Sequence, residues 1–249
     1  MKRESTNELT PFPRRIAIAA TDVHVVRFAL DRPFEAALAL LDDDERSRAS
    51  RFVFDTDRRR YIHSHAWVRT ALGRCLDRDP ASLRFTVGPH GKPRLVESTV
   101  DLRHNLSHAA DRALLAVALG SDVGVDIERE RPVEVSELAR RFFASAESAE
   151  LEALPEAERT AAFFRCWTRK EAFIKALGDG FGFPLDGFEV SLAEGNARQV
   201  LRTCREDPAA LHRWRIESLP AEAGYAAAVA VRAETGRLCL WDEPALGTP

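Results

Sequence analysis

The sequence predicts an α+β fold built from two similar halves, related by a pseudo-twofold axis, with a ligand cleft between them. Each half reads as a strand, then helices, then further strands, and each closes on an apolar strand: ALLAVAL at residues 113–119 and YAAAVAV at residues 225–231. These closing strands lie roughly 110 residues apart, a long-period similarity typical of repeated units. Clefts between such halves are common ligand sites.

The N-terminal half is expected to open with a strand at residues 23–30 (VHVVRFAL). Residues 42–52 predict a helix, because three aspartates precede basic residues, which is the charge order that the helix dipole favours. Residues 57–76 predict a longer helix, because apolar and aromatic side chains recur on one face. Shorter strands are expected at residues 84–87, around Leu102 and at residues 113–119.

The C-terminal half is expected to begin with a strand at residues 122–128, followed by helices at residues 135–143 and 161–177. Strands should follow at residues 188–192, 213–219 and 225–232. The chain is thus predicted to consist of a flexible N-terminus (1–15), an N-terminal α+β half (16–121) and a C-terminal α+β half (122–249).

Composition narrows the functional class. Of the 249 residues, 45% are hydrophobic and 30% are charged, as in an ordinary soluble globular protein. The net charge of −3 gives no reason to expect a nucleic-acid binder. The first ten residues are polar and of mixed charge, unlike a signal peptide, and the longest apolar stretches are far too short to span a membrane.

The cysteines indicate a reducing compartment. Their spacing contains no C-x-x-C pair and so offers neither a zinc site nor a disulfide framework. We expect buried reduced thiols and a cytoplasmic monomer. The four residues are Cys75, Cys166, Cys204 and Cys239.

The segment DVGVDIE, residues 122–128, carries the first chemical signal. On a strand, Gly124, Asp126 and Glu128 share one face and the apolar residues share the other. Two carboxylates at i and i+2 repel each other unless a positive group lies between them, and a hard divalent cation is the usual solution. Gly124 would leave room for a close ligand on that face. An exposed strand face with two solvated acids is the alternative, and the spacing alone does not decide.

The second signal is the helical segment FFRCWTRKEAFIKALGDGFG, residues 163–182. Its apolar stripe contains Lys170, which must either extend to solvent or meet a buried anion. Glu171 and Lys175 lie together at i and i+4 on the flank of this stripe, where an ordinary surface ion pair is the alternative. Gly178 is expected to end the helix.

Two further short motifs, HGKP at residues 90–93 and NLSH at residues 105–108, are weak signals alone. His108 by itself would more often be a hydrogen-bonded structural histidine. In their order and spacing, however, GKP, NLSH, VGVDIE (123–128), WTRKEAFIKALGDGF (167–181) and FPLDGFEV (183–190) resemble the 4'-phosphopantetheinyl transferases of the surfactin-synthetase-activating type. One departure follows His108, where relatives often carry Ser-Gly and this chain has Ala109 and Ala110.

The resemblance implies the 4'-phosphopantetheinyl transferase fold and a reaction. The serine hydroxyl of an apo acyl or peptidyl carrier protein would attack the phosphorus that bears the pantetheine arm of coenzyme A, and adenosine 3',5'-bisphosphate would leave. The carrier could belong to a fatty-acid, polyketide or peptide synthase. Phosphoryl transfer depends mostly on positioning and charge neutralisation.

The resemblance also implies roles for individual residues. Asp126, Glu128 and Glu171 would hold Mg²⁺, and Glu171 would act as general base, directly or through a metal-bound water. Lys175 would face the pyrophosphate and take part in catalysis. The remaining coenzyme A contacts would be Lys170 at the pyrophosphate, Lys92 and Ser107, and, around the 3'-phosphate, His108, Arg48 and Arg60.

The candidate carrier surface is the segment that leaves the acidic strand, which carries Arg129, Arg131, Arg140 and Arg141 beside Phe142 and Phe143. The alternative is that the phenylalanines belong to the core and the arginines are merely solvated. Two other functional classes stay open as well: a magnesium-dependent pyrophosphate hydrolase and a non-catalytic coenzyme A-binding module. The basic set argues against the first class and the intact acids against the second.

Overall fold

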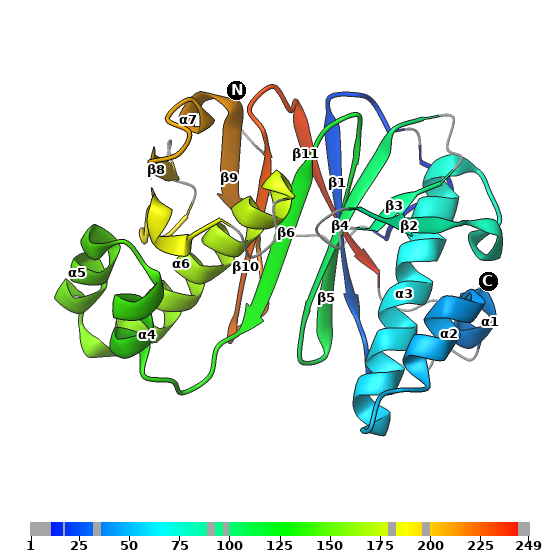
Figure 1. Cartoon of the computed structure of the whole chain (residues 1–249), viewed down its shortest axis with the longest axis horizontal. Helices are drawn as coiled ribbons and strands as arrows, with labels where there is room; N and C mark the ends of the chain where they lie inside the picture. Colours follow the sequence, from blue (N-terminus) through cyan, green and yellow to red (C-terminus); the bar gives the residue numbers. More distant parts are fainter. Residues whose placement is uncertain are drawn as a thin grey trace.

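The structure is a computed structural model that describes residues 11–16, 18–31, 36–88, 93–96, 100–178, 183–195 and 200–243. It is an α+β protein, as the sequence predicts, with helices on two sides of a central pair of sheets (Figure 1). None of the helices in this described part of the chain has the length and apolar character of a membrane span.

The predicted elements of the N-terminal half are present with shifted ends. The strands are β1 (Asp22–Ala29), β2 (Phe85–Val87), β3 (Pro93–Leu95), β4 (Leu102–Ala109) and β5 (Arg112–Leu119). The α-helices are α1 (Ala37–Leu40), α2 (Asp43–Ala49) and α3 (Asp55–Leu76). The sequence analysis did not predict α1 or β3, which are only four and three residues long.

The C-terminal half contains the predicted elements and four more. Its strands are β6 (Val123–Arg129), β7 (Phe188–Val190), β8 (Leu201–Cys204), β9 (Trp214–Ser218), β10 (Tyr225–Arg232) and β11 (Arg237–Glu243). Its α-helices are α4 (Val135–Phe142), α5 (Ser145–Ala153), α6 (Glu156–Leu177) and α7 (Ala210–Arg213). The sequence analysis missed α5, α7, β8 and β11.

One of the two main sheets contains strands from both predicted halves. A four-stranded sheet has the order β11-β1-β5-β4, and a three-stranded sheet has the order β6-β10-β9. β11 pairs in parallel with β1 from Asp22–Arg237 to Phe28–Glu243, although it comes from the segment predicted as the C-terminal half. The last described strand therefore completes the sheet of the first half.

Two of the apolar cores lie on either side of the four-stranded sheet. On its outer face, β1 and β5 pack against Trp67, Val68, Ala71 and Leu72 of α3. On its inner face, they pack against valines of β6 and β10. The far side of the three-stranded sheet is covered by α6, so that the layers follow the order helix, sheet, sheet, helix (Figure 1).

Gly124 sets the contact between β6 and α6. A Cβ atom at this position would lie 2.1 Å from the carbonyl oxygen of Ala172 and 2.4 Å from the backbone nitrogen of Ala176. The prediction that Gly124 leaves room for a ligand is therefore wrong, because the backbone of α6 fills that space. The close approach brings Glu171 and Lys175 of α6 onto the strand face that carries Asp126.

Lys170 is fully buried on α6 and is paired inside the C-terminal core. Its Nζ lies 2.7 Å from Oε2 of Glu147 and donates to the carbonyl oxygens of Leu185 at 2.8 Å and Phe188 at 2.6 Å. Glu147 is also buried and accepts the backbone N–H groups of Ala144 and Val190. Of the two alternatives left open for Lys170, extension to solvent or a buried anion, the second is found, and the anion is Glu147 on α5.

We predict that Gly124→Ala lowers the free energy of unfolding by about 1–3 kcal/mol or more, because the added methyl group meets backbone atoms that cannot turn aside. Urea denaturation followed by circular dichroism measures the change. Gly236→Ala is the matched control, because a Cβ there would meet its nearest atoms, those of Thr21, only at 3.3 Å. Wild-type stability of Gly124→Ala would contradict the close helix–strand contact.

Lys170→Met is expected to cost about 3–5 kcal/mol of unfolding free energy, because it leaves the carboxylate of Glu147 buried without its cation. The double variant Lys170→Met with Glu147→Gln should be more stable than Lys170→Met, since the lone charge is then removed as well. Arg140→Met, which breaks the exposed pair with Glu152, should change stability by less than about 1 kcal/mol. The same denaturation measurement compares the three, and a double variant no more stable than Lys170→Met would refute the pairing.

Candidate active site

Asp126 is the centre of the candidate site. Its side chain projects from β6, is 3% exposed, and accepts through Oδ1 from Ser107 Oγ of β4 at 2.8 Å and from Lys175 Nζ of α6 at 2.6 Å. Lys175 Nζ also lies 3.0 Å from Ser107 Oγ. The other oxygen, Oδ2, is buried and has no hydrogen-bond partner among the described residues. Three elements therefore meet at one carboxylate that still has an unused oxygen.

Glu128 and Glu171 are half-buried beside Asp126. Burial raises the pKa of all three carboxyl groups, and the charge of Asp126 raises the pKa of Glu128 and Glu171 further. Glu171 is also raised by Glu128, so the three acids repel one another. Lys175 offsets part of this repulsion. Three crowded acids with an unpartnered buried oxygen form a donor set that suits a hard cation with oxygen ligands.

β4 is held against β6 by side chains of the NLSH motif. Asn105 Oδ1 accepts the backbone N–H of Val125 at 2.8 Å, and Ser107 Oγ lies 3.4 Å from the backbone nitrogen of Ile127. Asn105 therefore positions the acidic strand, a role that the sequence analysis did not assign to it. The position of Asn105 two residues before Ser107, on the same face of the strand, was the available signal.

A basic group surrounds His108 at the end of β4. Desolvation lowers the pKa of His108, and the charges of Lys175, His65 and Arg60 lower it further, so these side chains lie within electrostatic reach of its ring. The guanidinium of Arg48 lies 5.9 Å from the ring of Tyr61, and Tyr61 packs on His65 with ring centroids 4.0 Å apart. His65 was not predicted as a site residue.

A buried arginine fixes the helices that carry this basic group. Arg69 of α3 is fully buried and bonds to Asp42 and to Glu45, the residues that cap the N-terminus of α2. It also donates to the carbonyl oxygen of Leu83 at 2.9 Å. Glu45 in turn contacts His65 Nδ1 at 3.0 Å. The position of Arg48 on α2 is thereby tied to that of Arg60 on α3.

One of the expected coenzyme A contacts, Lys170, is not part of this site. All three donor positions of Lys170 Nζ are taken by protein oxygens in the core, so its ammonium has no proton left for a phosphate, and the prediction of a pyrophosphate contact is corrected. Lys92 lies outside the described residues.

The turn after His108 is formed as a tight hairpin. Ala110 in this turn has a φ of 51°, a conformation that favours glycine.

A cavity of about 410 Å³ opens beside Glu171 and Lys175. Most of its wall is apolar, with Arg141 and Asp186 at its polar edges. The apolar lining comes from Phe142 and Ile174 together with Phe183, Pro184 and Leu185, which belong to the FPLDGFEV motif. The sequence alone had assigned no role to this motif. Phe142 is thus partly a cavity residue, whereas Phe143 is buried in the core.

Comparisons with known proteins agree with this arrangement. Residues 122–230 match the family described as "4'-phosphopantetheinyl transferase superfamily". Residues 29–119 match the family described as "4'-phosphopantetheinyl transferase, N-terminal". The chain is 37% identical over 188 residues to 4'-phosphopantetheinyl transferase HetI of Nostoc sp. strain PCC 7120, covering 73% of this chain and 79% of HetI.

Two relatives from bacilli show similar agreement. Identity is 32% over 168 residues with 4'-phosphopantetheinyl transferase Sfp of Bacillus subtilis strain 168, covering 66% of this chain and 74% of Sfp. It is 31% over 174 residues with 4'-phosphopantetheinyl transferase psf-1 of Bacillus pumilus, covering 70% of this chain and 73% of psf-1. The chain therefore belongs to the 4'-phosphopantetheinyl transferase superfamily.

Proposed function

We propose that this enzyme transfers the 4'-phosphopantetheine arm of coenzyme A to a serine hydroxyl of an apo carrier protein through the site centred on Asp126. The observation that carries the proposal is the unpartnered oxygen of Asp126, which lies among three mutually repelling carboxylates and next to Lys175. Such a site binds a divalent cation together with phosphate oxygens, as phosphoryl transfer from a diphosphate ester requires.

Asp126, Glu128 and Glu171 are the residues that would hold Mg²⁺. When bound, Mg²⁺ supplies charge neutralisation at the pyrophosphate and at the leaving group. The carboxylates offer oxygen donors from two elements, β6 and α6, that Gly124 holds in contact. Lys175 partly neutralises Asp126 and supplies positive charge on the pyrophosphate side of the site.

The rest of coenzyme A is oriented by two regions of opposite character. His108, Arg60 and Arg48 supply positive groups for the 3'-phosphate. Ser107, next to His108 on β4, donates to Asp126. The apolar cavity beside Glu171 suits the pantetheine arm, because it offers apolar walls next to the reacting centre. The diphosphate would then lie between the basic group around His108 and the apolar cavity beside Glu171.

Glu171 is the group that would take the proton of the attacking serine. It borders both the acidic cluster and the apolar cavity, so a hydroxyl brought to the cavity mouth lies between the base and the reacting phosphorus. Oriented proton removal of this kind contributes about 10²–10⁴-fold to a rate. Lys175, on the next turn of α6, stabilises the negative charge that builds on the phosphate oxygens.

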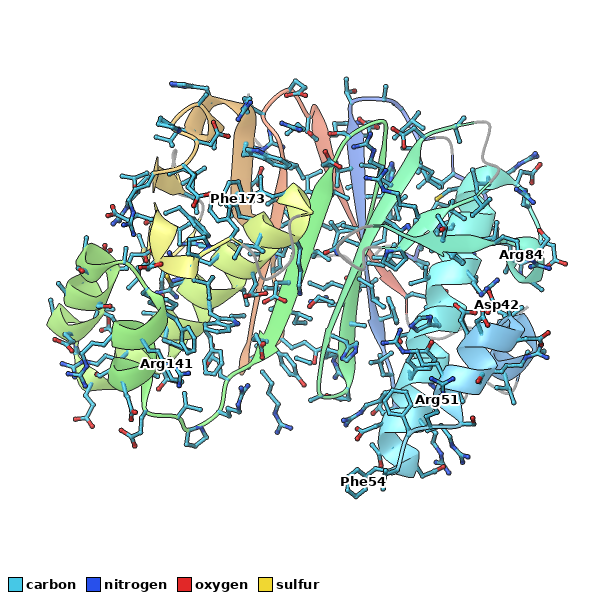
Figure 2. All side chains as sticks on the ribbon, viewed as in Figure 1. Asp42, Arg51, Phe54, Arg84, Arg141 and Phe173 are labelled. Atoms are coloured by element: carbon cyan, nitrogen blue, oxygen red, sulfur yellow. The ribbon has the colours of Figure 1, made fainter. Side chains whose placement is uncertain are left out.

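The carrier protein is proposed to approach from the side of α4. Arg140 and Arg141 are exposed there, and Arg141 borders the cavity. Figure 2 shows Arg141 on α4 and Arg51 just before α3, on opposite sides of the sheets. Basic side chains on both sides would attract an acidic carrier domain.

We further propose that the protein is a monomer and that it is cytoplasmic. The cytoplasm is a compartment consistent with the four unpaired thiols.

Asp126→Asn and Glu171→Gln are expected to lower kcat for carrier modification by about 10²–10⁴-fold, which corresponds to several kcal/mol of lost cation-assisted stabilisation. The assay incubates the enzyme with coenzyme A, Mg²⁺ and an apo carrier protein and follows the mass of the carrier. Chelator added to wild type should have the same effect. Glu130→Gln, just beyond the acidic strand face, is the control and should retain activity. Full activity of Glu171→Gln at saturating Mg²⁺ would contradict the assignment.

His108→Ala and Arg60→Ala are expected to raise KM for coenzyme A about 10–100-fold, the equivalent of one charged hydrogen bond of about 1.5–3 kcal/mol. KM for 3'-dephospho-coenzyme A should change much less, because that substrate lacks the phosphate. Steady-state transfer with each substrate measures the difference. Arg58→Ala, on the same turn of α3 but paired with Asp55, is the matched control. Equal losses with both substrates would remove these residues from the 3'-phosphate site.

A further inference from the structure

A second cluster of metal-ligating side chains lies where β11 joins β1, outside the proposed active site. It consists of Asp22 and His24 on β1 and Cys239 on β11, and one ligand atom of each lies within 4.8 Å of the other two. Asp22 and His24 are two positions apart and so share one face of the strand. Cys239 is the register partner of His24 across the parallel pair, which places its thiol on the same face.

His24 carries the feature that points to a ligand. Its side chain is 3% exposed, and its Nε2 has no hydrogen-bond partner within the described ranges. Its Nδ1 accepts from the indole Nε1–H of Trp241 at 3.0 Å, and the two rings are stacked. Because Nδ1 accepts, the single ring proton is on Nε2, where it is buried without an acceptor. Such an orphaned nitrogen is unusual in a folded protein. In the other ring tautomer, with the proton on Nδ1, the same buried Nε2 carries the lone pair that a metal ligand needs.

Burial and neighbouring charges shift the pKa values of these side chains. Burial lowers the pKa of His24. A hydrogen bond from Arg237 lowers the pKa of Asp22, which keeps that carboxylate charged. Burial raises the pKa of Cys239, so this thiol has to lose its proton when it binds a cation.

We propose that Asp22, His24 and Cys239 form a binding site for a transition-metal ion of borderline softness, with Zn²⁺ as the best fit. One thiolate sulfur, one imidazole nitrogen and one carboxylate oxygen match the ligand types of Zn²⁺, and a water can complete four-coordination. A thiolate and an imidazole do not suit Mg²⁺, which prefers oxygen ligands. The site is independent of the proposed function of the Asp126 cluster.

Metal binding requires a local rearrangement that makes the proposal specific. The Cys239 thiol releases one proton to solvent as the metal–sulfur bond forms. A neutral imidazole has one nitrogen lone pair in the ring plane, and that pair now accepts from Trp241. Coordination therefore breaks the Trp241–His24 hydrogen bond, whether the ion takes Nδ1 or the ring proton moves from Nε2 to Nδ1. Trp241 is thus a competitor of the metal.

The experiment titrates Co²⁺, and then Zn²⁺, into the full reduced chain in saturating Mg²⁺. We expect one equivalent of Co²⁺ to give a thiolate-to-cobalt charge-transfer absorption that Zn²⁺ abolishes, and Zn²⁺ to raise Tm. Cys239→Ser should lose the absorption and should weaken Zn²⁺ binding by more than the roughly 10–100-fold typical of outer-shell losses. Trp241→Phe keeps a ring against His24 but removes the competing donor, and it should bind Zn²⁺ more tightly than wild type.

Cys75→Ser is the matched control, because Cys75 is also a partly buried, unpaired thiol but lies on α3, and it should keep the absorption. If Cys239→Ser does not fold, Asp22→Asn serves as a second ligand variant. It should weaken Zn²⁺ binding. Absence of the absorption in the wild type, its persistence in Cys239→Ser, or weaker Zn²⁺ binding by Trp241→Phe would overturn the proposal. None of these outcomes depends on transfer activity, so the test is separate from that of the proposed function.

Discussion

The contact between α6 and β6 at Gly124 is the constraint on which the candidate active site depends. A helix normally rests on a sheet through side chains, which keep the two backbones apart. Here a carbonyl oxygen and a backbone nitrogen of α6 occupy the space that a Cβ atom at position 124 would need. This closeness allows Lys175 to reach Asp126 and Ser107 directly. The acids of the strand and of the helix thereby lie close enough for the charge of Asp126 to raise the pKa of Glu128 and of Glu171.

The two lysines of α6 show how position on one helix separates structure from chemistry. Lys170 faces the core, where Glu147 and two carbonyl oxygens use all its donors. Lys175 lies five residues further on, at the edge of the sheet, and its partner Asp126 still has an unused oxygen. The first lysine holds α5 and the β7 region against the helix, whereas the second pairs with a carboxylate of the candidate active site.

Much of this arrangement could be predicted from local patterns, because strand alternation and helical periodicity depend only on neighbouring residues. The acidic face of β6 and the flank of α6 were predicted in this way, and they do meet. What the patterns could not supply was the partner of Lys170, because Glu147 lies on a helix whose mixed composition shows little periodicity. The cysteine spacing likewise predicted no zinc site, but it could not show that β11 pairs with β1 and brings Cys239 beside His24. The cavity near Glu171 is formed by segments that converge only in the folded chain.

The pairing of β11 with β1 also bears on how the protein is made. Asp22 and Arg237, which face each other across the two strands, are 215 positions apart in the chain. During synthesis, the outer edge of β1 cannot be covered until the ribosome has released residue 243, so the growing chain carries an unpaired strand edge for most of its translation. Pairings at such separation also slow folding, because a long loop must close first. This protein would therefore most need a chaperone during the part of its synthesis in which the edge of β1 is still unpaired.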